Sequence, residues 1–306
     1  MNLLITGIAG FIGSRIAKEA LRKGYNVIGA DDLSKGYKTN VPPHIDFLQV
    51  DLTRPDCVDQ LPQNIDVILH LAGQSSGEIS FDNPVTDLEK NAISTLNLIK
   101  YGIGIKAKKI IYASSMSVYG TTVDAAIPET IECAPLSCYG TSKLAAEHYL
   151  EIYKSKLPYI AFRMFNVYGP GQDMSNLRQG MVSIYLAHIL KNKHVSVKGN
   201  LNRFRDFIYI DDVVDIWLQA IINHTANNNK FNLATGVRTT VAQLLERIKE
   251  IIPGISWAEI GNTPGDQFGI YADTTKLKEF FDVSNFTTLD SGLERFIKWA
   301  ADCKNN

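Results

Sequence analysis

A glycine-rich turn close to the start of the chain constrains the fold more than any other feature. The apolar run 2–6 is long enough for a buried parallel strand, and it leads directly into three evenly spaced glycines, Gly7, Gly10 and Gly13. Residues 14–23 then have apolar side chains at helical spacing, and 25–30 is a second apolar strand. This order predicts an α/β fold in which a doubly wound parallel sheet carries helices on both faces.

The same turn has the composition of a dinucleotide site. Glycines let the backbone approach a pyrophosphate, and the free N–H groups of the helix N-terminus favour an anion. Asp31, at the tip of the second strand, can accept hydrogen bonds from a ribose and should repel a 2′-phosphate. We therefore expect NAD rather than NADP, held by Gly7, Gly10, Phe11, Ile12, Gly13, Asp31 and Asp32. The alternative is a tight turn that binds no ligand.

Bulk composition excludes several other classes of protein. The chain has 306 residues, 45% of them hydrophobic, and a formal net charge of −1 without runs of like charge, which argues against nucleic acid or an anionic membrane as the main partner. Its four cysteines and six histidines lack metal-ligand spacing, so no metal is expected. Scattered cysteines and the lack of a membrane-length apolar run predict a cytoplasmic protein.

Two further strands of the first half end in residues suited to a cofactor. The strand 45–50 ends at Asp51 and Leu52, which are placed to meet the adenine ring or are an ordinary strand end. The strand 66–70 contains His70, which we interpret as a core residue. It leads into a turn of small and apolar residues that allows close approach to the cofactor, Leu71, Ala72 and Gly73. The polar loop 74–82 is expected near the nicotinamide or the substrate.

A serine-bearing strand end and a tyrosine–lysine pair form the candidate catalytic set. The strand 109–113 delivers the segment 114–120 to the carboxyl edge of the sheet, and Tyr139 and Lys143 lie four residues apart on one helix face. A tyrosine, with a pKa of about 10, is a poor base unless nearby positive charge lowers that value. As a phenolate, Tyr139 could remove a hydroxyl proton while hydride leaves the same carbon. Alone, such a pair is common on solvated helices.

Taken together, these motifs resemble those of extended short-chain dehydrogenases/reductases of the NAD-dependent sugar-nucleotide epimerase/dehydratase family. The resemblance extends to about residue 273. It implies that Ser115, Tyr139 and Lys143 are catalytic, and that Asn91, on the predicted helix 84–101, supports the active site. The resemblance also implies that the cofactor contacts include Tyr139, Lys143, Asn91 and Phe165, and that the substrate contacts are Ser115, Ser117, Asn166, Arg205 and Asp266. The alternative for Arg205 is a surface salt bridge, for example to Asp206.

Departures from the family pattern restrict which of the family's reactions is expected. Met116 and Ser117 replace the acidic pair that follows the active-site residue in 4,6-dehydratases, so dehydration is disfavoured. Thr263 stands where many members have an arginine, and Ser75 where some epimerases have a lysine, which puts one phosphate contact and one cofactor contact in doubt. Ile270 replaces a tyrosine that limits the sugar pocket of some 4-epimerases, and a smaller residue could admit an N-acetyl group.

The resemblance therefore implies an NAD-dependent epimerase that acts at C4 of a UDP-hexose, either the glucose/galactose or the N-acetylhexosamine pair, through a 4-keto intermediate. A CDP-sugar 2-epimerase, a 4-keto reductase and a non-catalytic NAD-binding protein remain alternatives. We expect a cofactor domain over 1–165, to which 206–235 returns, and a substrate lobe over 166–306. A homodimer through the helices 84–101 and 139–154 is also expected.

Overall fold

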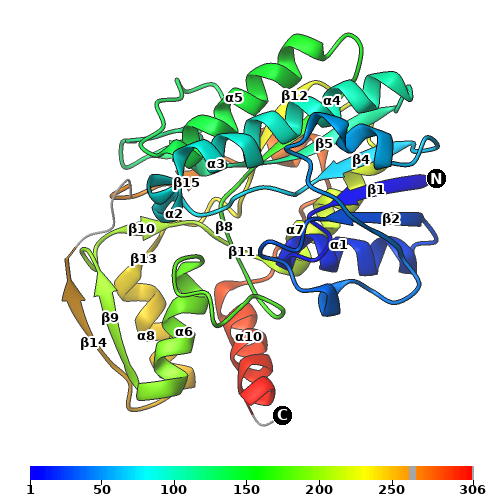
Figure 1. The fold of residues 1–306 in the computed structure, drawn as a ribbon. Helices are drawn as coiled ribbons and strands as arrows, with labels where there is room; N and C mark the ends of the chain where they lie inside the picture. The colour runs from blue at the N-terminus through cyan, green and yellow to red at the C-terminus, as the bar shows by residue number, and fades with distance from the viewer. Residues whose placement is uncertain (262–266, 305–306) are drawn as a thin grey trace.

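A parallel β-sheet forms the centre of the molecule (Figure 1). The computed structural model describes residues 1–261 and 267–304, and within these the sheet has seven strands in the order β12-β7-β5-β4-β1-β2-β3. All neighbouring pairs are parallel. The strands are β1 (Asn2–Thr6), β2 (Asn26–Asp31), β3 (Asp46–Gln49), β4 (Val67–His70), β5 (Lys109–Ser115), β7 (Tyr159–Met164) and β12 (Asn229–Leu233). The predicted fold class is confirmed.

Alternation along the strands explains why helices cover both faces of this sheet. Leu3 and Ile5 belong to one buried cluster, whereas Leu4, between them, belongs to another. The first face is covered by α1 (Phe11–Arg22) and α7 (Ile210–Ile222), and the second by α4 (Ser94–Gly104) and α5 (Cys138–Tyr153). Strand order reverses between β1 and β4, and in open α/β sheets ligands bind at the carboxyl ends of the strands beside such a point.

A late segment of the chain completes the sheet. β12 pairs with β7, with Phe231 opposite Phe162. The Phe162 ring lies with its centroid 5.5 Å from that of Trp217, on α7, and 6.2 Å from that of Phe231. All three aromatic side chains are buried. Residues 206–235 thus contribute a strand and a helix to the sheet layers, although they follow part of the second lobe in sequence.

The remaining elements form a smaller lobe beside the carboxyl edge of the sheet (Figure 1). Its helices are α6 (Met181–Asn192), α8 (Val241–Ile251) and α10 (Leu289–Lys304), whereas α9 (Thr275–Phe280) packs against β12 of the central sheet. Among the described residues, four two-stranded sheets accompany them: β6 (Ala126–Ile127) with β15 (Tyr271–Ala272), β8 (Asn166–Tyr168) with β11 (Phe207–Tyr209), β9 (His194–Lys198) with β14 (Ser256–Ile260), and β10 (Phe204–Arg205) with β13 (Thr239–Thr240). Short 3₁₀ turns cover Lys38–Asn40, Pro55–Gln60 and Met116–Val118.

The helix predicted over 84–101 is interrupted. It consists of α3 (Pro84–Leu88), a π-helical turn (Glu89–Ile93) and α4, and it is preceded by α2 (Gly77–Asp82) within the loop predicted as polar. Local periodicity does not reveal a π-turn, which often marks a functional site inside a helix. Across the part of the chain that the structure describes, no helix combines the length and apolar character that a membrane span requires.

Candidate active site

The glycine turn is built so that only glycine fits at two of its positions. Gly7 has a φ of +72°, and a Cβ there would lie 2.6 Å from the amide nitrogen of Ala72. A Cβ on Gly13 would lie 2.2 Å from the carbonyl oxygen of Gly7. Gly10 is the N-cap of α1 and offers no side-chain cap, so the amides of the first turn have no intrahelical acceptor. The turn therefore presents a backbone surface suited to a diphosphate.

The residues that flank this turn lie at the same edge of the sheet. Phe11 and Ile12 open α1, and the Phe11 ring faces Gly171, where an added Cβ would be 3.7 Å from it. Leu71 and Ala72 follow β4 and close the other side of the turn, because both lie within 3 Å of the position that a Cβ of Gly7 would take. The structure thus brings together two strand ends that are far apart in sequence.

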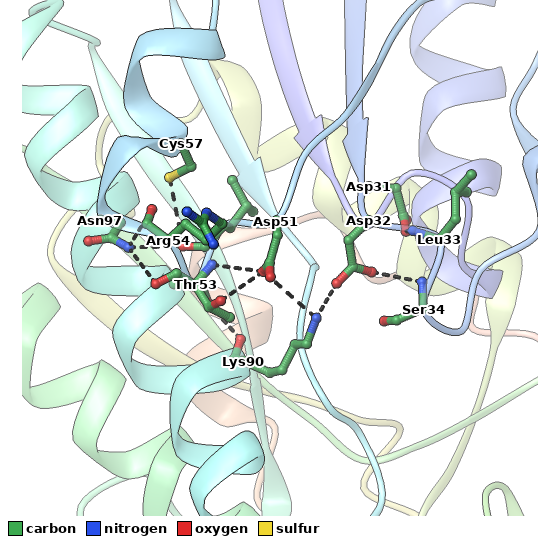
Figure 2. Close-up of polar contacts among 12 residues, drawn as sticks. Asp31, Asp32, Leu33, Ser34, Asp51, Thr53, Arg54, Cys57, Lys90 and Asn97 are labelled. Carbon is green, nitrogen blue, oxygen red and sulfur yellow. Dashed lines mark hydrogen bonds and ion pairs between the residues drawn. The ribbon is translucent and has the colours of Figure 1, made fainter.

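The predicted adenosine contacts lie at the ends of β2 and β3 (Figure 2). Asp31 is buried and accepts hydrogen bonds from the amides of Ala9 (3.0 Å) and Leu33 (2.9 Å). Burial raises the pKa of its carboxyl, against those two hydrogen bonds. Asp51 accepts from the amide (3.1 Å) and hydroxyl (2.9 Å) of Thr53, and the neighbouring Leu52 is buried.

Lys90 connects two of these acids, and sequence reasoning missed it. Its ammonium forms an ion pair with Asp32 and lies 3.8 Å from Oδ1 of Asp51 (Figure 2). Burial alone would raise the pKa of Asp32, but the hydrogen bonds from Lys90 and Ser34 bring it below its usual value. The chain offers no local signal for this bridge, because Lys90 is 58 residues from Asp32.

Ser115, Tyr139 and Lys143 come together at the carboxyl end of β5 and the first turns of α5. All three are buried. Ser115 hydrogen bonds to the Tyr139 side chain and accepts from the amide of Ser117 at 3.1 Å. The Lys143 ammonium donates to the Ala113 carbonyl at 2.9 Å and lies 5.8 Å from the Tyr139 ring centroid. The helix starts where it does because Ser137 caps it, accepting from the amide of Gly140.

Burial has the largest effect on the pKa values of Tyr139 and Lys143. It raises the pKa of Tyr139 to about 12, with the Ser115 hydrogen bond acting in the opposite direction. It also lowers the pKa of Lys143 to about 8. The expectation that Lys143 and a cationic nicotinamide ring together lower the pKa of Tyr139 stays a prediction, because among the groups of the chain removal from water has the largest effect.

Asn91, on the π-turn, extends this cluster toward the glycine turn. It is fully buried, and its Nδ2 donates to the Ser142 hydroxyl at 3.0 Å. Its Oδ1 is buried without a hydrogen-bond partner and faces Gly73, where an added Cβ would lie 2.5 Å from it and 3.3 Å from the Lys143 ammonium. An unpaired buried acceptor beside a glycine cradle and an ammonium fits the hydroxyls of a bound nucleotide ribose.

His70 is a structural residue, as the sequence indicated. It is fully buried between the hydroxyls of Thr6 (2.8 Å) and Thr95 (3.0 Å). Burial lowers the pKa of its imidazole to about 3, so the ring is neutral at physiological pH. Within the described part of the chain, no group of His, Cys, Asp or Glu side chains has the arrangement of a metal site.

The predicted substrate contacts are less uniform. The side-chain amide of Asn166 donates to the carbonyl of Asp206 at 3.2 Å, and the preceding Phe165, which was predicted as a cofactor contact, is buried. Arg205 is buried rather than on the surface, and it donates to the carbonyls of Gln267 (2.8 Å) and Phe268 (3.2 Å). Asp266, and Thr263 with it, lie outside the described residues. Arg205 thus anchors the segment that directly follows Asp266.

The structure shows the contacts of Asp206 and of two residues that depart from the family pattern, Ser75 and Ile270. Asp206 accepts hydrogen bonds from the amide and hydroxyl of Thr235, so its role is to hold that turn. Ser75 accepts from the side chain of Gln179 at 2.7 Å, which ties the loop after β4 to the second lobe. Ile270 is fully buried in a small apolar cluster with Phe165 and its neighbours, so it does not open a pocket to solvent.

A Rossmann-type sheet, a glycine turn at its switch point and a buried Ser/Tyr/Lys set define a dinucleotide-dependent enzyme of the short-chain dehydrogenase/reductase type. Residues 3–234 match the model of the NAD dependent epimerase/dehydratase family, and the chain belongs to that family.

Individual relatives match the chain over nearly its whole length. A putative UDP-glucose 4-epimerase of Methanocaldococcus jannaschii is 33% identical over 310 residues, which cover 99% of each chain. The crystal structure of UDP-glucose 4-epimerase with UDP-glucose from Thermotoga maritima superposes with a TM-score of 0.95 at 33% identity, covering 99% of this chain and 100% of the other. The Thermus thermophilus UDP-glucose 4-epimerase complex with NAD has a TM-score of 0.89 at 29% identity and 98% coverage of both.

Proposed function

We propose that this chain is an NAD-dependent UDP-sugar epimerase that inverts C4 of a UDP-hexose. One observation supports this proposal most directly. The Tyr139–Lys143 helix, the Ser115 strand end and the unpaired Asn91 carbonyl oxygen meet beside the glycine turn. Membership of the epimerase family supports the same reaction class.

The residues that would hold NAD follow the sheet edge. The amides that follow Gly10 meet the diphosphate, and Asp31 accepts from the adenosine ribose. Asp51 would accept from the adenine amine, and Lys143 and the unpaired Oδ1 of Asn91 would bind the nicotinamide ribose. When bound, NAD supplies the acceptor and later the donor of the C4 hydride. Asp31 disfavours a 2′-phosphate by charge, which selects NAD over NADP.

Tyr139 moves the proton of the C4 hydroxyl. With Ser115 donating a hydrogen bond, Tyr139 takes that proton as the 4-keto sugar forms, and it returns the proton after the sugar has turned its other face to the cofactor. Burial holds the pKa of the free side chain at about 12, so ionisation needs positive charge close by. A protonated Lys143 and the cationic nicotinamide ring supply it.

Substrate anchoring belongs to the second lobe. Asn166 and Arg205 would hold the nucleotide diphosphate, with Asp266 at its ribose, while the sugar rotates about that linkage. A planar guanidinium suits this contact because it meets two phosphate oxygens at once. Met116 and Ser117, at the start of the turn after β5, provide no general acid or base for elimination of water. That chemistry favours epimerisation over dehydration.

We place the enzyme in the cytoplasm as a homodimer. All four cysteines are free, as in a reducing compartment. Large apolar side chains are exposed along the helices predicted to form the interface: Val85 and Leu88 on α3, and Tyr149 and Ile152 on α5. An apolar surface of this kind marks a protein–protein contact.

One assay tests the reaction. Purified protein is incubated with UDP-, dTDP-, CDP- and GDP-sugars without added cofactor, and the products are separated by chromatography. We expect the 4-epimer of a UDP-hexose to form, since NAD is regenerated within each turnover. Conversion of a CDP-sugar at C2, or turnover only with added NADH, would instead favour the alternative reactions.

Tyr139→Phe tests the assigned base. The phenyl ring keeps the packing but cannot accept a proton, so kcat should fall by about 10²- to 10⁴-fold while the bound NAD content stays at the wild-type level. Tyr25→Phe, at the amino end of β2 and away from the predicted interface, is the control and should retain full activity. Near-wild-type turnover by Tyr139→Phe would refute the assignment.

A further inference from the structure

A buried carboxylate lies behind the Tyr139–Lys143 pair and has no role in the reaction described above. Asp87, on α3, is 1% exposed. Its Oδ2 accepts from the Ser142 hydroxyl at 2.6 Å, and its Oδ1 accepts from the side-chain amides of Gln74 (2.8 Å) and Asn91 (3.2 Å). Burial raises the pKa of the Asp87 carboxyl, and the hydrogen bonds from these partners, each donated to a carboxylate oxygen, act against that shift in favour of the ionised form.

The partners of Asp87 reach the catalytic residues from two sides. Ser142 lies between Tyr139 and Lys143 on α5, and it also accepts from the Asn91 amide at 3.0 Å. That hydrogen bond aims the unpaired Oδ1 of Asn91 toward Gly73 and the Lys143 ammonium. Asp87 therefore fixes the orientation of both Ser142 and Asn91.

The charges of the two side chains also connect Asp87 with Lys143. The Lys143 ammonium donates to a backbone carbonyl and lies 5.0 Å from the Tyr112 ring centroid. Asp87 supplies the negative charge that acts on this ammonium, raising the pKa of Lys143 against the larger effect of burial. A buried ammonium without a counter-charge raises the free energy of the folded state, and a nearby carboxylate reduces that penalty.

We propose that Asp87 is a positioning residue that keeps Lys143 protonated and, through Ser142 and Asn91, oriented for the proton transfer by Tyr139. The inference rests on the proposed function for its reaction, but its electrostatic content can be measured without any substrate.

The groups around Tyr139 and Lys143 determine which charges can change the pKa values of these two side chains. Tyr139 shares α5 with Lys143, Tyr112 comes from β5, and the neutral His70 comes from β4. On α2, Glu78 and Asp82 face Arg178 of the second lobe instead. Removal of the Asp87 charge should therefore lower the pKa of both Lys143 and Tyr139, because that charge raises both.

Direct titration of Lys143 provides the test. The protein is labelled with 13C at lysine Cε, and the Lys143 signal is assigned by its absence from Lys143→Met. Assignment matters because burial lowers the pKa of Lys109 to about 8 as well. We expect a wild-type midpoint near pH 8 and a midpoint lower by about one pH unit in Asp87→Asn. Glu89→Gln, which removes an exposed charge from the adjacent π-turn, is the control and should leave the midpoint unchanged.

The pH profile of turnover gives the second readout. In Asp87→Asn both limbs of the profile should move to lower pH, whereas a purely structural role would reduce kcat without moving them. Asp87→Glu, which retains the charge, should return the Lys143 midpoint toward the wild-type value. If Asp87→Asn fails to fold, Asp87→Ser removes the charge and keeps an acceptor for Ser142, and it is titrated in the same way.

The two readouts separate the inference from the proposed function. An unchanged Lys143 midpoint in a folded Asp87 variant would overturn the inference whatever the substrate is. A lower midpoint, in an enzyme that converts no UDP-sugar, would confirm the charge relation and overturn the proposed reaction instead.

Discussion

Single residues in this chain take their roles from partners that are distant in sequence. Asn91 and Lys90 are neighbours, yet Asn91 is buried beside Lys143, whereas Lys90 reaches the acids at the ends of β2 and β3 (Figure 2). The first contributes to the candidate catalytic cluster and the second to the adenosine end of the same site. In the NAD site that we propose, the two residues would act at opposite ends of the cofactor.

Lys90→Met should weaken NAD binding without changing the chemistry. The ammonium separates two carboxylates that would otherwise repel each other and the cofactor diphosphate. A partly exposed ion pair contributes about 0.5–1 kcal/mol, so the Kd for NAD should rise by about two- to fivefold. Calorimetry on cofactor-free protein measures this, with kcat at saturating NAD unchanged.

The matched control for Lys90 is Lys100→Met, on the exposed side of α4, which should bind NAD like the wild type. The difference between Lys90→Met and the wild type should also shrink in 1 M salt, where the Debye length is about 3 Å. An affinity loss of equal size in both variants would show that Lys90 acts only through the net charge of the protein.

At the scale of elements, a buried ion pair fastens the catalytic helix to the sheet. Glu147 of α5 binds the Arg163 guanidinium through both carboxylate oxygens, at 3.0 and 2.7 Å, and it accepts from the Ser114 hydroxyl at 2.5 Å. Arg163 lies on β7, and Ser114 is next to Ser115 on β5. The pair therefore sets the position of α5, and of Tyr139 on it, relative to the serine.

Glu147→Gln should destabilise the protein by about 3 kcal/mol, because it leaves the Arg163 charge buried without its counter-charge. Urea unfolding followed by circular dichroism measures this. Glu246→Gln removes a carboxylate whose ion pair with Lys249 is exposed, and we expect a change below about 0.5 kcal/mol. Equal effects of the two substitutions would contradict the structural role of the buried pair.

At the scale of the whole molecule, the helical layer that contains α3 and α5 exposes large apolar side chains on its outer surface. α7 and α1 pack against each other on one face of the sheet, and the second lobe lies beside the carboxyl edge. The outer surfaces of α3 and α5 have no covering element among the described residues, and they expose Val85 and Ile152 at 68% and 69%. A second copy of the chain is the partner that we propose for this surface.

Ile152→Glu should convert the dimer to a monomer, since a buried unpaired carboxylate is costly in an apolar interface. Light scattering after size-exclusion chromatography measures the mass. Ile222→Glu, at the end of α7 and 61% exposed, is the control and should remain dimeric. A wild-type protein that is monomeric at every concentration would remove the basis for the proposed interface.

The sequence by itself determined the parts of this protein whose signals are local. The apolar run 2–6, the glycine spacing and the acid at residue 31 define a strand, a turn and a second strand end within one short stretch. The four-residue spacing of Tyr139 and Lys143 likewise places them on one helix face whatever surrounds them. Each of these depends on backbone geometry that repeats over a few residues.

The tertiary structure alone decided how these groups are charged and held. The pKa of Tyr139 rises to about 12 because surrounding elements remove it from water, and no spacing along the chain encodes that burial. Asp87, Lys90 and Glu147 are ordinary helix residues in the sequence. Their partners come from other elements, 55, 58 and 16 residues away for Ser142, Asp32 and Arg163. Desolvation and charge pairing depend on distances in space, so they exist only once the sheet has brought those elements together.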